Sequence, residues 1–301
     1  KMSQIEPSRH PKADLSKPLS DYENQVDRFV IKFWGVRGLI PTPGEENNSY
    51  GGNTACVEMQ VAGKKLIFDA GTGLRVLGRI WLQQQQKTTA HLFFTNAQTN
   101  RIQGFPFFAP AFAPGNCFHI YGTAASNGAS IKQSLSDQML LPHFPYPLQV
   151  MESELQFYNL TPDKVIAIDD VTVQMVLINN STKSVGYRIQ LKEYSVAYIT
   201  DLSSEIDDSE QENLMKLVKG VDLLIANPSY ITSNFCETQT PIDCYWQVAV
   251  DLARKTGVKQ LIFSNHHPND NDDFLDKIET NLKKEFEQGF LAHEGMVISI
   301  N

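Results

Sequence analysis

Along most of the chain, apolar and polar residues form short blocks. In some blocks apolar residues alternate with polar ones, and in others they recur every three or four positions. Short apolar or alternating blocks predict strands, and longer blocks with apolar residues three or four positions apart predict helices. The predicted strands are 29–34, 56–61, 65–68, 90–95, 117–121, 165–168, 171–178, 184–191, 195–200, 221–226, 260–263 and 296–300. The predicted helices are 74–86, 130–141, 210–218, 245–256 and 272–288. This order predicts an α/β fold with two sheets.

The first part of the chain departs from this pattern. Residues 1–27 are rich in Pro, Ser, Lys and Asp and contain no apolar block. We therefore expect an N-terminal extension that is poorly ordered and is not a signal peptide. Residues 28–301 are expected to form a single domain.

Composition narrows the class of protein. The 301 residues are 42% hydrophobic and 20% charged, as in ordinary globular proteins. The net charge of −8 makes nucleic acid an unlikely partner, because nucleic-acid binders usually carry a basic face. No apolar run reaches the length of about 18 residues that spans a bilayer, so we expect no membrane span.

Cysteine usage points to a reducing compartment. Cys56, Cys117, Cys236 and Cys244 are scattered, and no C-x-x-C pair occurs. We expect buried free thiols in a cytoplasmic protein, although a bridge between Cys236 and Cys244 would close only a short loop.

Candidate chemistry concentrates in one stretch, residues 92–108. A buried strand ends there at the polar residues 96–101, and a more apolar run with a Gly-Phe-Pro turn follows. Strand ends are where α/β folds usually carry their chemistry. This stretch is therefore the first place to look for a site.

Several motifs in order resemble one known family. They are Phe33-Trp-Gly-Val-Arg-Gly38, Ser49-Tyr-Gly-Gly-Asn-Thr54, Phe68-Asp-Ala-Gly-Thr-Gly73, Ile102-Gln-Gly-Phe-Pro-Phe-Phe108, Val185-Gly-Tyr-Arg188 and Tyr198-Ile-Thr-Asp201. Together they resemble the metallo-β-lactamase fold superfamily, in its phosphodiesterase-like and RNase Z-like branch. The resemblance implies a four-layer αβ/βα sandwich, with two mixed β-sheets flanked by helices. It also implies a homodimer.

The same resemblance assigns the metal-ligand positions of the family to residues of this chain. The signature His-x-His-x-Asp-His falls on Asn96, Gln98, Asn100 and Arg101, and two later His positions fall on Asn180 and Asn265. The bridging carboxylate is kept as Asp201. The accessory positions are Asn227, where an Asp is usual, and Asp243, where a His is usual, and Asp69 corresponds to a buttressing carboxylate.

These replacements remove the chemistry of a two-metal hydrolase. Such a centre needs imidazole and carboxylate ligands to hold cations roughly 3.5–4 Å apart. Neutral amides are weak ligands for zinc, and the guanidinium of Arg101 repels a dication. The sequence therefore predicts no metal cofactor, with Arg101 paired to Asp201 in its place. In the alternative, Arg101 points to solvent and Asp201 caps a loop.

The primary hypothesis is thus a non-catalytic member of the family. It would bind an anionic small molecule, such as a nucleotide, or a regulatory protein partner in the former active-site cleft. The alternative is a phosphodiesterase-type hydrolase that uses Zn or Mn at a relocated site on Asp201, His266, His267 and Asp243. The His-rich segment 266–273 is also explained as a loop that enters a helix. A third hypothesis is an interaction protein whose cleft has closed.

Overall fold

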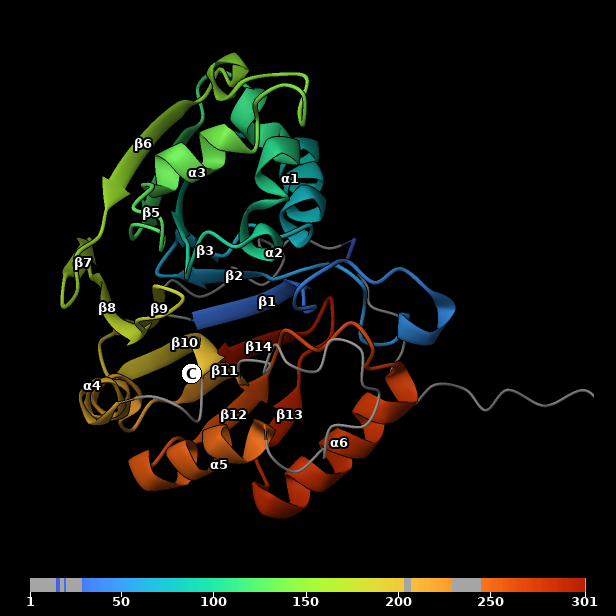
Figure 1. Ribbon diagram of the computed structural model, residues 1–301, viewed down its shortest axis with the longest axis vertical. Helices are drawn as coiled ribbons and strands as arrows, with labels where there is room; N and C mark the ends of the chain where they lie inside the picture. Colours follow the sequence, from blue (N-terminus) through green and yellow to red (C-terminus); the bar gives the residue numbers. More distant parts are fainter. Residues whose placement is uncertain (1–14, 17–18, 20–28, 203–206, 229–244, 301) are drawn as a thin grey trace, which may run out of the picture.

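The computed structural model of the protein describes residues 15–16, 19, 29–202, 207–228 and 245–300. In this part of the chain two seven-stranded sheets face each other. Helices α1–α3 cover the outer side of one sheet and helices α4–α6 the outer side of the other (Figure 1). The predicted four-layer αβ/βα sandwich with two mixed sheets is confirmed.

The first sheet combines antiparallel and parallel strands. Its four strands from β14 to β3 are antiparallel, and those from β3 to β6 are parallel. In spatial order the strands are β14 (Val297–Ile300), β1 (Phe29–Gly35), β2 (Cys56–Val61), β3 (Lys64–Phe68), β4 (Thr89–Phe93), β5 (Cys117–Gly122) and β6 (Glu154–Asn159).

The second sheet repeats the same arrangement. It is antiparallel from β7 to β10 and parallel from β10 to β13. In spatial order its strands are β13 (Gly289–Leu291), β12 (Gln260–Phe263), β11 (Leu223–Pro228), β10 (Tyr194–Leu202), β9 (Ser184–Leu191), β8 (Val171–Asn179) and β7 (Val165–Ile168).

Alternating apolar residues explain why these strands stack. One face of each sheet contributes to a shared core that includes Phe33, Phe68, Tyr187, Tyr198 and Ile225. The opposite faces pack against the apolar stripes of the helices, as expected for strands with period two. The helices are α1 (Gly73–Gln83), α2 (Thr99–Ile102), α3 (Ile131–Asp137), α4 (Asp208–Val218), α5 (Tyr245–Thr256) and α6 (Asp272–Glu285).

Most predicted elements are present, with shifted ends. Two short strands, β6 and β13, were not predicted. Strand β6 is an edge strand whose side chains are largely exposed or half-buried, so its hydrophobic alternation is weak. Strand β13 has only three residues. The helix predicted at 130–141 ends at Asp137, because the chain turns there and Gln138 Nε2 donates to the Ile102 carbonyl.

The topology places several strand ends at one place. In both sheets the parallel strands run side by side, so their carboxyl ends meet at the same edge. Asp69 follows β3, Asn96 follows β4, and Asn265 follows β12. Asp69 and Asn265 both adopt left-handed backbone conformations, with φ of 61° and 63°. Asp and Asn tolerate this conformation better than most residues, and it turns the chain sharply at the strand end.

The structure describes only part of what was expected for the cysteines and the N-terminal extension. Cys56 and Cys117 carry free thiols, whereas Cys236 and Cys244 lie outside the described residues. So do nearly all residues of the expected N-terminal extension. No helix in the described ranges is both long and apolar enough to cross a membrane.

Candidate functional site

The strand ends enclose a buried arginine. Arg101 lies in the short helix α2, directly after the loop that leaves β4, and only 2% of its side chain is exposed. Its guanidinium extends between the two sheets to Asp69 after β3, Asn265 after β12 and residues near the end of β10. Four segments that are distant in sequence therefore meet at one cation.

The guanidinium has two carboxylate partners. Arg101 Nη1 lies 3.1 Å from Asp69 Oδ2, and Nη2 lies 3.6 Å from Asp201 Oδ1. The amide of Asn265, with its oxygen toward the guanidinium, accepts from Nη1 at 2.7 Å and from Nη2 at 3.2 Å. Nη2 also donates to the Thr200 carbonyl at 3.4 Å. The predicted pair of Arg101 with Asp201 is present, and Asp69 is the nearer of the two carboxylates.

Asp69 is held by several donors from both sheets. It accepts hydrogen bonds from the Thr95 N–H and hydroxyl, each at 2.9 Å, and from the Tyr198 hydroxyl at 3.1 Å. Burial raises the pKa of Asp69, while the Arg101 charge and the bonds from Thr95 lower it. Burial alone would lower the pKa of Arg101, but Asp69 and Asp201 outweigh it and raise that pKa. Arg101 therefore stays charged in the interior.

Asp201 is fixed by a second group of polar residues. Asn96 Nδ2 donates to Asp201 Oδ2 at 2.5 Å and to Ser184 Oγ at 3.0 Å. The Ser184 hydroxyl in turn donates to Asp201 Oδ2. Thr182 Oγ1 lies 2.7 Å from Ser184 Oγ. Both carboxylates are thus oriented by hydrogen bonds that leave them little freedom.

The predicted site residues divide into those that join this cluster and those that do not. Asn227 is buried beside it and donates from Nδ2 to the Thr200 carbonyl at 3.1 Å. Asn100 is buried in α2, and Gln98, directly before this helix, is exposed. Asn180 is exposed and contacts Glu210 and Lys183 instead. Asp243 lies outside the described residues.

The two neighbouring histidines face other groups. His266 is buried, its Nε2 donates to the Ala292 carbonyl at 2.7 Å, and its ring packs edge-on against Tyr50. Burial and the nearby charge of Arg37 lower the pKa of His266 to about 3. His267 Nδ1 accepts from the Asn269 N–H at 3.2 Å. The residue that meets the site is therefore Asn265, without the one-residue slip that a histidine ligand would require.

A metal centre does not fit these residues. The resemblance implies Zn or Mn, which need imidazole nitrogens and several carboxylates. The part of the chain that the structure describes contains no group of three or more His, Cys, Asp or Glu side chains placed to hold a metal ion. Instead, a protonated guanidinium lies between the two carboxylates. Amides and a guanidinium cannot lower the pKa of a bound water as a metal does.

Three residues of this cluster were missed from the sequence. Thr95 and Tyr198 bind Asp69, and Ser184 binds Asp201. Thr95 could have been found, since it ends the predicted strand directly before Asn96. Tyr198 shares the interior face with the other core residues of its strand, and no sequence signal sets its hydroxyl apart.

The comparisons with known proteins agree with this fold. A family model described as "Beta-lactamase superfamily domain" matches residues 64–266, which is more than half of the chain. The chain belongs to this family. No curated protein matches the sequence.

Several solved structures resemble most of the fold. The metallo-beta-lactamase fold protein YhfI from Bacillus subtilis is 16% identical, with a TM-score of 0.64, and covers 91% of this chain and 100% of its own. A diphosphatase of the PhnP family is 17% identical, with a TM-score of 0.61 and coverage of 91% and 97%. The short form of human tRNase Z is 16% identical, with a TM-score of 0.59 and coverage of 90% and 99%. At these identities the likeness establishes the fold, not the activity.

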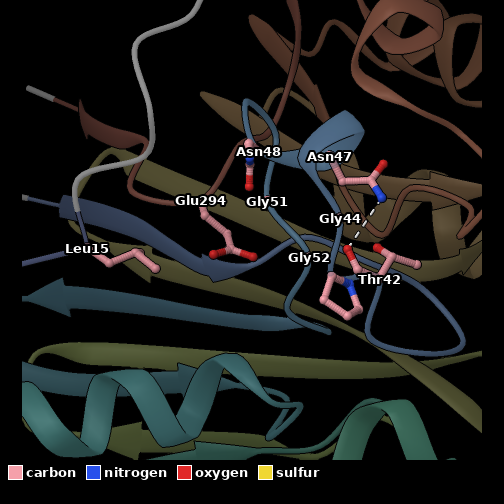
Figure 2. A pocket seen from close by; sticks show the side chains of 9 residues that line it. Leu15, Thr42, Gly44, Asn47, Asn48, Gly51, Gly52 and Glu294 are labelled. Carbon is pink, nitrogen blue, oxygen red and sulfur yellow. Dashed lines mark hydrogen bonds between the residues drawn. The ribbon is translucent and has the colours of Figure 1, made fainter.

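A cavity of about 240 Å³ lies elsewhere, beside the loop that contains residues 42–52 (Figure 2). Glu294 lines it, but its carboxylate already accepts from Asn53 N at 2.5 Å and Asn53 Nδ2 at 3.0 Å. Asn47 donates to the Thr42 carbonyl and accepts from Arg37. These side chains hold the loop in place, so the centre around Arg101 is the stronger candidate site.

Proposed function

We propose that this protein is a non-hydrolytic member of the beta-lactamase superfamily, in which the Arg101 guanidinium takes the place of the metal centre. The single observation that carries the proposal is the contact of Arg101 with both Asp69 and Asp201. A cation of the protein itself neutralises the carboxylates that would otherwise attract metal. Without metal-bound hydroxide, the site has no group that generates a nucleophile at neutral pH.

The charge of the centre favours one kind of ligand over another. When Asp69 and Asp201 are both ionised they carry two negative charges, whereas Arg101 carries one positive charge. All three side chains are largely buried, so an anion in solution does not reach the guanidinium. This argues against a nucleotide bound on Arg101. We therefore propose that the protein acts through a protein partner, while the former centre braces the two sheets.

The proposal is tested by a hydrolysis assay on the full chain with zinc or manganese added. Bis(p-nitrophenyl) phosphate serves as the phosphodiester probe, with Asp201→Asn as the matched variant. We expect the wild type and the variant to give the same rate as buffer that contains the metal. Turnover by the wild type that Asp201→Asn abolishes would overturn the proposal.

A thermal-shift titration tests the choice of ligand. We expect neither inorganic phosphate nor AMP to raise the melting temperature, because Arg101 has no unpaired charge for them. A rise in the wild type that is lost in Asn96→Ala, which removes one donor and keeps the charges of Arg101 and both carboxylates, would restore the anion hypothesis.

A further inference from the structure

Three side chains with nitrogen or sulfur donors lie together on the inner face of the first sheet. His91 belongs to β4, Cys117 and His119 belong to β5, and the strand register pairs His91 with His119. Side chains two positions apart share a face of a strand, so the group lies on the same face as Phe93 and Tyr121, which belong to the core between the sheets. Unlike those core residues, all three are half-buried, so a small ion can reach them. The group is therefore a candidate binding site.

A hydrogen-bond network on the neighbouring strand β6 fixes the proton of His119. The Glu154 carboxylate only accepts, and Gln156 Nε2 donates to it at 2.6 Å, which directs Gln156 Oε1 to the Tyr158 hydroxyl. Tyr158 donates its one proton to this oxygen at 2.6 Å. The hydroxyl therefore accepts from the Nδ1–H of His119, 3.2 Å away. With its proton on Nδ1, His119 carries a lone pair on Nε2.

The Nε2 lone pair of His119 faces a thiol. Cys117 Sγ lies 3.7 Å from Nε2. An ion bound at about 2.0 Å from the nitrogen and about 2.3 Å from the sulfur would join these two atoms at an angle of about 120°. Ions with three ligands in a plane use this angle. The two side chains are thus placed to share one metal ion, with a third position left open to a ligand from solution.

His91 holds the His119 ring in this orientation. The two rings stack with centroids 4.6 Å apart and planes 12° apart. His91 Nδ1 lies 3.2 Å from the Tyr121 hydroxyl, so the imidazole-to-tyrosine contact of His119 is repeated one strand earlier. Burial and the neighbouring His119 lower the pKa of His91 to about 4. At neutral pH the stacked ring is uncharged and does not repel a cation.

We propose that Cys117 and His119 bind one Cu(I) ion. Thiolate sulfur prefers soft ions such as Cu(I), and imidazole nitrogen also suits copper. Cu(I) is held by as few as two or three ligands, whereas zinc in proteins almost always takes four. The described ranges contain no group of three or more His, Cys, Asp or Glu side chains placed for a metal ion, so zinc does not fit here.

Binding exchanges one proton for the ion. Burial and the Glu154 carboxylate raise the pKa of the Cys117 thiol, so the thiol is protonated before binding. Cu(I) forms bonds to Sγ and to Nε2, the S–H bond breaks, and its proton leaves to solvent. No electron is transferred. The site lies at the beginning of β5, whereas Arg101 lies beyond the end of β4, so it does not depend on the centre around Arg101.

Isothermal titration calorimetry of the full chain, with Cu(I) added as its acetonitrile complex in the absence of oxygen, tests the proposal. Cys236 and Cys244 lie outside the described residues and are first replaced in a Cys236→Ser/Cys244→Ser background. We expect this background to bind one Cu(I) per chain, and Cys117→Ser or His119→Gln in it to lose the binding. Tyr158→Phe, which removes the acceptor of the His119 proton, should weaken binding roughly tenfold.

Cys56→Ala in the same background is the matched control. Cys56 is the other free thiol in the described ranges, and it is fully buried. We expect this variant to keep the Cu(I) ion, and circular dichroism verifies the fold of each variant. Cys117→Ala replaces Cys117→Ser if that variant does not fold. A background that binds no Cu(I), or one that keeps the ion after Cys117→Ser and loses it in Cys56→Ala, overturns the proposal.

Discussion

Two arginines are buried to the same degree but in different surroundings. Arg37 is fully buried and Arg101 is 2% exposed. Arg37 donates hydrogen bonds to neutral oxygens, which include the carbonyls of Gly51 at 2.7 Å, Asp270 at 2.6 Å and His267 at 3.3 Å, and the side chain of Asn47 at 3.2 Å. Arg101 instead meets two carboxylates.

The difference separates an arginine that connects loops from one that neutralises carboxylates. Arg37 joins the loop before Gly51 to the segment that follows β12, largely through backbone carbonyls. Arg101 is held by side chains, Asp69 and Asp201, that carry charge of their own. Under the proposed function, these carboxylates stand where the family binds metal, and Arg101 supplies the cation that neutralises them.

The largest expected effect comes from the removal of Arg101. Arg101→Met leaves Asp69 and Asp201 without their cation in the interior, and should lower the free energy of unfolding by about 3–5 kcal/mol. Urea denaturation measures it. Arg254→Met is the control, because its ion pair with Glu285 at 2.9 Å is exposed and should contribute less than about 1 kcal/mol. Equal losses in both variants would contradict the account.

The same variant should also change the pH dependence of stability. Burial raises the pKa of Asp69, and Arg101 opposes this rise. Without Arg101 the folded pKa rises further, so the folded state binds a proton where the unfolded state does not. Stability then increases as pH falls through the folded pKa toward the unfolded pKa, and this gain is lost as pH rises through the folded pKa. We expect the deficit of Arg101→Met to shrink at acidic pH in urea denaturation. A constant deficit would show that Asp69 does not depend on Arg101.

His266, near Arg37, should affect the pH dependence of stability in the direction opposite to that of Asp69 in Arg101→Met. The pKa of His266 is lowered to about 3, from about 6.5 in the unfolded chain. The unfolded state therefore takes up a proton first, and His266 makes the protein lose stability as pH falls below about 6.5. His266→Gln should flatten this loss by roughly 2.7 kcal/mol between neutral pH and pH ~4.5. Asp270, whose pKa burial raises to about 6, acts with the opposite sign and is present in both proteins. If stability falls with pH equally in His266→Gln and in the wild type, the pKa of His266 is not lowered by folding and the account of its burial is wrong.

A smaller effect distinguishes two positions near Asp201. Ser184 donates to Asp201 from the interior, whereas Asn180 is exposed. Ser184→Ala should cost about 1 kcal/mol through the lost hydrogen bond. Asn180→Ala should stay within about 0.5 kcal/mol of the wild type. The reverse order would return Asn180 to the site.

The sequence predicted the two sheets and the strand-end position of the site, because apolar periodicity and the order of motifs determine both. It also predicted the pair of Arg101 with Asp201. It did not predict that Asp69 is the nearer carboxylate, since that depends on the sharp left-handed turn at Asp69 itself. The placement of Ser184 rather than Asn180 depends on the turn between β8 and β9, whose path no periodicity reports. Whether Asn265 or His266 faces Arg101 depends on where β12 ends to within one residue, which periodicity does not determine.

The most direct test of the central claim is the metal content of the purified full chain. The protein is incubated with excess zinc and manganese, desalted and analysed for both elements. If Arg101 neutralises Asp69 and Asp201 in place of a metal, the content should be close to zero per chain. One or two tightly held ions per chain, lost in Asp201→Asn, would contradict the account and restore a metal site at the strand ends.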